Sequence, residues 1–192
     1  MRVFERIQDM LMSVVQYYTQ NGYNHIQIVY YPENKEDRWH QIDTKLTKKF
    51  RLDLNKGQRA YRKRKKQTNF AGLRYKNICL ILHTPGSFDL EGETFVDMRQ
   101  KNVLLDVGSV VKVELKIVDG VGAIKYEKRS YQDLKEIVKQ IAANPKVWQH
   151  KKELEKIKHL PAVRRKMHLQ KDHLFELYKQ ECKKHNQKPF TL

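Results

Sequence analysis

The chain has 192 residues, and its 39 lysines and arginines against 22 aspartates and glutamates give a formal net charge of +17. Hydrophobic residues make up 40% of the chain, which excludes disorder throughout and suits one domain, or one domain with an appendage. Positive charge in such excess repels itself unless a polyanion neutralises it, so nucleic acid is the first partner to consider.

Cysteine content and hydropathy argue against a disulfide-stabilised, secreted or membrane-spanning protein. Cys79 and Cys182 are too few for a disulfide framework and indicate thiols in a reducing compartment. The N-terminal positions where a signal peptide would be apolar carry charges, and no run of about 18 apolar residues occurs. We therefore expect an intracellular protein without a membrane partner, in the cytoplasm and otherwise in a nucleoid or nucleus.

The first third of the chain alternates helix and strand patterns. Apolar residues at steps of three or four predict an amphipathic helix over 3–20. The β-branched and aromatic run 26–31 predicts a strand. A helix is expected from about Glu36, the stretch 53–57 is expected to end it, and a second helix is expected over 58–66.

The middle third carries the strand signals. The continuous apolar run 78–82 predicts a strand that is buried on both faces. Shorter strands are expected over 94–98 and 102–106. The clearest β pattern is the alternation from Val110 to Glu127, where Asp119-Gly120 predicts a type I′ hairpin turn.

The last third is helical. Ser130 is the expected N-cap of a helix that ends before Pro145, and two further helices are predicted over 147–159 and 162–185, with a hinge at Pro161. The fold class is therefore α+β: a mainly antiparallel sheet with a central β-hairpin, flanked by an N-terminal helix, basic helices and C-terminal helices.

This pattern divides the chain into two predicted parts. An α+β nucleic-acid-binding domain spans 1–144 and contains a basic insertion, 45–76. A basic helical extension follows over 145–192.

The insertion 45–76 holds thirteen lysines and arginines and one acidic residue, Asp53, for a net charge of +12. Such side chains neutralise phosphates and release counterions, and interleaved aromatic residues can stack on unpaired bases. The alternative is an ordinary solvated helix face, although such faces usually mix signs of charge. The predicted nucleic-acid contacts are Lys48, Lys49, Arg51, Arg59, Tyr61, Arg62, Lys63, Arg64, Lys65, Lys66, Arg74 and Tyr75.

The C-terminal part is also basic, with a net charge of +8 over 144–192. Arg164, Arg165 and Lys166 are expected to be auxiliary phosphate contacts. Apolar residues keep helical spacing here, so these helices are expected to pack on the sheet or against a protein partner or a second copy of the chain.

One arrangement is suited to catalysis. Glu114 and Lys116 are two apart on the hairpin strand, so both side chains lie on one face, and an upstream Asp97 or Asp106 would complete a carboxylate pair able to hold Mg²⁺. This arrangement resembles the core of the PD-(D/E)XK nuclease superfamily, and the resemblance implies a metal-dependent nuclease. The alternative is a solvent-facing strand with cross-strand charge pairs to Lys125 or Glu127.

The leading functional hypothesis is a non-enzymatic nucleic-acid-binding protein, RNA or DNA, that contacts phosphates through the basic helical segment. It would be an accessory factor in nucleic-acid processing or serve a mobile-element function. No cofactor is expected, apart from Mg²⁺ if the nuclease alternative holds. A third hypothesis is an interaction module within a ribonucleoprotein or with an acidic protein.

Overall fold

The computed structural model describes all residues of the chain except 89–91, 108–110 and 191–192. These residues form two compact units. The first comprises 1–105 and 115–123, and the second comprises 106–114 and 124–192.

The first unit is built on a five-stranded sheet in the order β1-β3-β4-β2-β5. β1 pairs in parallel with β3, and the pairs β3–β4, β4–β2 and β2–β5 are antiparallel. The predicted mainly antiparallel α+β fold is thus confirmed. The strands are β1 (Arg2–Val3), β2 (His25–Tyr30), β3 (Phe70–Tyr75), β4 (Ile78–His83) and β5 (Val96–Asp97).

The centre of this sheet is β4, and every one of its residues is buried. The prediction from its continuous apolar run is therefore confirmed. β3 was not predicted, because Gly72 and Arg74 interrupt its apolar pattern. A Cβ at Gly72 would lie 2.5 Å from Cδ1 of Leu52 and 2.7 Å from Sδ of Met1, so these two side chains would have to shift to admit it.

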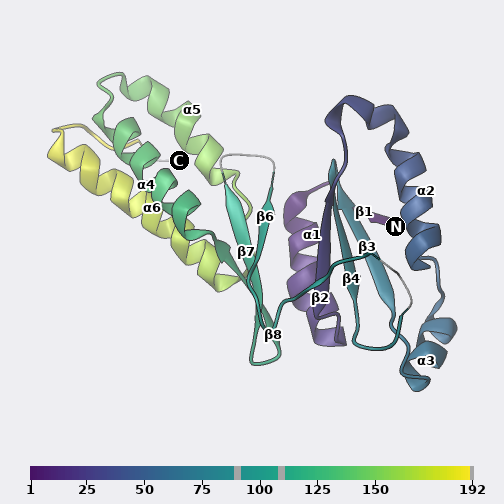
Figure 1. The fold of residues 1–192 in the computed structure, drawn as a ribbon. Helices are drawn as coiled ribbons and strands as arrows, with labels where there is room; N and C mark the ends of the chain where they lie inside the picture. The colour runs from purple at the N-terminus through teal and green to yellow at the C-terminus, as the bar shows by residue number, and fades with distance from the viewer. Residues whose placement is uncertain (89–91, 108–110, 191–192) are drawn as a thin grey trace. The chain divides into compact units, whose positions relative to one another are not determined.

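Helices cover the two faces of this sheet (Figure 1). On one face lies α1 (Ile7–Ser13), which continues as a π-helical turn (Val14–Tyr18) and a 3-10 turn (Thr19–Asn21). The prediction of a helix from residue 3 was wrong at its start, because Arg2 and Val3 pair with β3 as a strand.

On the other face lies α2 (Trp39–Phe50), preceded by a 3-10 segment (Glu33–Arg38). Its buried residues pack with sheet residues in an aromatic-rich core that includes Tyr31, Phe70 and Ile81. The basic helix α3 (Lys56–Arg64) follows, with a capping box between Asn55 and Gln58 at its N-terminus.

A second sheet has the order β6-β7-β8, with β6 (Val103–Asp106), β7 (Lys112–Val118) and β8 (Val121–Tyr126). Val110, the predicted start of the hairpin, lies outside the described residues. The predicted type I′ turn agrees with the positive φ of both Asp119 (50°) and Gly120 (76°). Gly122 lets β8 approach the N-terminal helix, because a Cβ there would lie 2.8 Å from the backbone of Val15.

The second unit contains the helices α4 (Lys128–Ala143), α5 (Val147–Lys158) and α6 (Arg164–Lys184). The predicted N-cap was wrong: Glu127 caps α4, and its carboxylate accepts hydrogen bonds from the N–H groups of Arg129 (2.9 Å) and Ser130 (2.8 Å). The Ser130 hydroxyl instead accepts from the N–H of Lys112 at 3.1 Å.

α4 packs along α6, so it groups with the C-terminal helices and not with residues 1–105. Within the described part of the chain, no helix combines the length and the apolar character needed to cross a membrane.

Candidate nucleic-acid interface

None of the residues of the basic helix α3 is buried. Two of its arginines bond the helix to the rest of the first unit. The Arg59 guanidinium donates to the carbonyl oxygens of Leu52 (2.9 Å), Leu54 (2.9 Å) and Phe70 (2.6 Å), and to the Tyr23 hydroxyl (3.2 Å). These bonds use most of the donors of one side chain. Arg59 was predicted as a phosphate contact, and the structure places it in the support of the helix.

Arg62 lies one turn further on and acts in the same way. Its Nε and Nη2 donate to the carbonyl oxygen of Thr68 at 3.0 and 2.7 Å. Arg59 and Arg62 are both half-buried and three residues apart, so they form the inner face of α3.

The other cations of α3 and of the turn that follows it face solvent. Lys56, Lys63, Arg64, Lys65 and Lys66 are all exposed, and their side chains form no hydrogen bond or ion pair with the residues that the structure describes. Because α3 ends at Arg64, the last two of these residues lie in the turn that follows, where Lys66 has a φ of 54°. We call these five residues the cation cluster.

The exposed ring of Tyr61 lies beside the cation cluster, with Nζ of Lys65 6.0 Å from its centre. A cation over an aromatic face is a favourable arrangement.

A hollow of about 650 Å³ runs along one side of α3. Lys56, Lys63 and Lys66 line it from the helix side, and Tyr17 and Asn69 line it from the rest of the first unit. The Oδ1 atom of Asn69 is buried and accepts no hydrogen bond from the described residues. We call this hollow the lysine groove.

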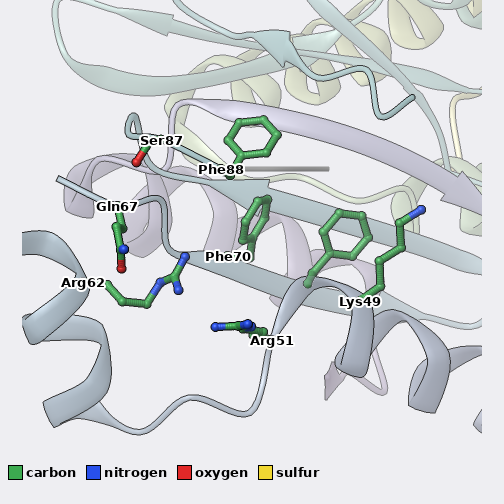
Figure 2. A pocket seen from close by; sticks show the side chains of 8 residues that line it. Lys49, Arg51, Arg62, Gln67, Phe70, Ser87 and Phe88 are labelled. Atoms are coloured by element: carbon green, nitrogen blue, oxygen red, sulfur yellow. The ribbon is translucent and has the colours of Figure 1, made fainter. Parts of the chain in front are cut away.

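A second hollow, of about 430 Å³, is shown in Figure 2. We call it the aromatic pocket. Arg51, Arg62 and Gln67 lie around it, Phe88 lies on the opposite side from the arginines, and Phe70 lies between Phe88 and the arginines (Figure 2). Gln67 lines both hollows. The residues that line the aromatic pocket are Lys49, Phe50, Arg51, Arg62, Gln67, Phe70, Ser87 and Phe88.

The loop after β4 reaches this pocket because a glycine lets two backbones meet. The N–H of Ser87 donates to the carbonyl of Lys66, and the N–H of Thr68 donates to the carbonyl of Ser87, both at 3.1 Å. Gly86 has a φ of 149°, and a Cβ there would lie 2.7 Å from the nitrogen of Thr68. This contact places Phe88 beside the segment that follows α3.

Aromatic and histidine rings form one row across the sheet next to the pocket. Phe70, His83, His25 and Asp97 are successive register partners on β3, β4, β2 and β5. The rings of His25 and His83 are stacked, with centres 4.4 Å apart and planes inclined by 6°. No sequence motif signals this pair, because its members are 58 positions apart and meet only through strand register.

Burial disfavours the charged form of both histidines in this row. It lowers the pKa of His83 to about 4 and also lowers the pKa of His25. His83 donates from Nδ1 to the carbonyl of Thr84 at 2.9 Å. The row therefore supplies uncharged aromatic surface behind Phe88, whose ring centre lies 5.0 Å from that of His83.

Other predicted contacts lie elsewhere. Arg74 and Tyr75 are at the end of β3 opposite Phe70, and Arg74 pairs with Asp43 at 3.0 Å. Lys48 and Lys49 are exposed in the last turn of α2, where Lys49 pairs with Glu93. Arg164, Arg165 and Lys166 begin α6 in the second unit.

The residues of the nuclease alternative have partners of their own. The Asp97 carboxylate accepts from the Arg99 guanidinium at 2.7 Å, and this bond contributes most to lowering its pKa to about 2. Glu114 pairs across the hairpin with Lys125 at 3.0 Å, which confirms the predicted cross-strand pair.

The remaining two residues of that alternative differ in exposure. Lys116 is exposed and Asp106, on β6, is half-buried. Within the described ranges, no three or more His, Cys, Asp or Glu side chains are grouped so that they could hold a metal ion.

Comparison with known proteins finds no family model, no curated protein and no solved structure that matches this chain.

Proposed function

We propose that this protein binds nucleic acid through the cation cluster and the adjoining lysine groove. The observation that carries the proposal is that the cations of α3 and the following turn fall into two groups, one bonded to the protein and one exposed. Arg59 and Arg62 hold the helix by hydrogen bonds to backbone carbonyls, while five further cations are exposed without protein partners in the described part of the chain.

This arrangement suits a phosphate backbone for two reasons. The cations repel one another, and phosphates that neutralise them release condensed counterions. The helix backbone that carries them is already fixed by Arg59 and Arg62, so binding loses less conformational entropy than it would in a flexible basic tail. The lysine groove, with Lys56, Lys63 and Lys66 along one wall, gives the backbone a path.

The test is the salt dependence of binding. A variant with Lys63, Arg64, Lys65 and Lys66 all changed to Gln removes four charges from the cluster. The matched control removes four exposed charges from the second unit, at Lys151, Lys152, Lys158 and Lys183. Affinities for labelled single- and double-stranded RNA and DNA would be measured from about 50 to 200 mM salt.

The cluster variant is expected to flatten the slope of log K against log salt by up to about 3 to 4, since each of the four lost phosphate contacts removes about 0.7 to 0.9. The control variant should keep the wild-type slope. An unchanged slope in the cluster variant would overturn the proposal. Equal binding of poly-glutamate and nucleic acid would instead favour an acidic protein partner.

A further inference from the structure

We propose that the aromatic pocket receives one unpaired base, so that the preferred ligand is a single-stranded segment. This inference rests on the proposed function, and it adds a base site to the phosphate surface. The juxtaposition behind it is a partly exposed phenylalanine, an exposed arginine and two exposed polar side chains around one hollow of about 430 Å³.

The stacking surface is Phe88, whose side chain is 39% exposed although it packs among other rings. Its ring makes edge contacts with Phe70 (5.5 Å between centres), His83 (5.0 Å) and Phe95 (6.1 Å). The ring is thus packed against three neighbours while part of it stays exposed, so an incoming base would meet an aromatic surface that is already in place. Because every base has a π-face, such stacking does not require a particular base sequence.

The polar groups match the remainder of a nucleotide. The Arg51 guanidinium is exposed and forms no hydrogen bond or ion pair with the described residues. It can stack on a base or contact a phosphate. The Gln67 amide and the Ser87 hydroxyl each donate and accept, as base edges require.

The position of the pocket favours a base that belongs to a nucleic-acid strand over a free nucleotide. Gln67 lines both the aromatic pocket and the lysine groove, so a base in the pocket would adjoin a backbone in the groove. A base inside a duplex is stacked and paired and cannot enter without being extruded. An unpaired base avoids that energy, and this difference predicts preference for single strands.

The experiment compares a single-stranded oligonucleotide with a hairpin duplex of the same length, for the wild type and four variants. Phe88→Ala removes the ring, Phe88→Trp retains a stacking surface, and Trp148→Ala removes a 74% exposed aromatic ring from α5 as the control. Phe88→Leu is included because it keeps apolar packing without a π-face. Thermal unfolding of each variant checks that it folds.

We expect Phe88→Ala and Phe88→Leu to weaken single-strand binding by roughly 5- to 100-fold, as loss of one stacked base does. Duplex affinity and the salt slope should stay unchanged, and Phe88→Trp should restore binding. A 2-aminopurine placed in the single strand should lose fluorescence on binding to the wild type and keep it with Phe88→Leu. Mononucleotides form a separate arm, and binding of these alone as tightly as the oligonucleotide would overturn the strand requirement.

The outcomes separate the two proposals. If the Phe88 variants bind single strands as the wild type does, or lose both polymers equally, the base site is refuted while the salt-slope test of the cation cluster stands. If the wild type binds neither polymer, both proposals fail.

Discussion

Nη1 of Arg59 donates a 2.6 Å hydrogen bond to the carbonyl oxygen of Phe70, the first residue of β3. This bond joins the most basic helix of the protein to the strand that forms one wall of the aromatic pocket. Arg59 thus serves as an internal connector although it lies in a run of cations, while Lys63, Arg64, Lys65 and Lys66 beside it are exposed.

Replacing Arg59 by Lys should destabilise the protein although the charge is retained. A single ammonium group cannot reproduce the guanidinium bonds to Leu52, Leu54 and Phe70, and the carbonyls left behind lose their donor. The expected loss in free energy of unfolding is about 2 to 4 kcal/mol. Urea unfolding measures it, and Lys63→Gln on the outer face is the control. A loss under about 0.5 kcal/mol would contradict this role for Arg59.

Gly86→Ala should lower the melting temperature more than Gly120→Ala. Both positions have positive φ, so both substitutions strain the backbone, but only at residue 86 does the new Cβ meet another backbone, 2.7 Å from the nitrogen of Thr68. Calorimetry gives the comparison. Because the clash displaces the loop that carries Phe88, Gly86→Ala should also weaken single-strand binding. Equal melting temperatures for the two variants would show that the loop shifts at little cost.

Stability should fall as the pH decreases from about 6.5 to about 4, the range between the ordinary pKa of histidine and that of folded His83. The folded state keeps His83 neutral while the unfolded chain takes up a proton, so acid favours unfolding. The full shift corresponds to about 3 kcal/mol, and solvent screening reduces it to about 1 to 2 kcal/mol. Below that range, release of Asp97 from Arg99 lowers stability further, because its folded pKa is about 2.

The measurement is urea unfolding at pH 7 and pH 4.5 for the wild type and His83→Phe, which keeps an aromatic ring in the row. The variant should lose less stability on acidification than the wild type. Exposed His168→Phe is the control and should behave as the wild type does. An identical acid loss in His83→Phe would assign the effect to other groups.

Both thiols should be inert in the folded protein. Cys79 and Cys182 are 0% exposed, and burial raises the pKa of Cys79 to about 12, so the reactive thiolate is scarce at neutral pH. Titration with Ellman's reagent at pH 8 should find no fast-reacting thiol, and two after unfolding in guanidinium. A fast reaction in the native state would indicate local opening of the sheet or of α6.

Glu114→Gln should leave nucleic-acid affinity unchanged and cost less than about 1 kcal/mol of stability, since its pair with Lys125 is a partly exposed cross-strand contact. The nuclease alternative has a different expectation, namely Mg²⁺-dependent cleavage by the wild type that this variant abolishes. Incubation of both proteins with labelled single- and double-stranded substrates in Mg²⁺ or Mn²⁺ distinguishes the two.

Local sequence patterns determined much of the fold. The continuous apolar run ending at Leu82, the Asp119-Gly120 turn and the helical spacing of the C-terminal third each predicted the element that the structure shows. These signals are local, since they depend on which faces of a segment are apolar and on which residues accept a left-handed backbone. β3 lacked such a signal, and it is a strand because β4 pairs along its whole length.

The position of the positive charge was likewise determined by the sequence alone, because a net charge of +12 over 45–76 is a property of composition. Only the tertiary structure decided what each cation does. Arg59 and Arg62 meet backbone carbonyls that the strand and loops bring to them, and the cation cluster remains in solvent. The aromatic pocket is also tertiary, because Arg51, Gln67 and Phe88 come from three separate segments that meet through the Gly86 contact and strand register.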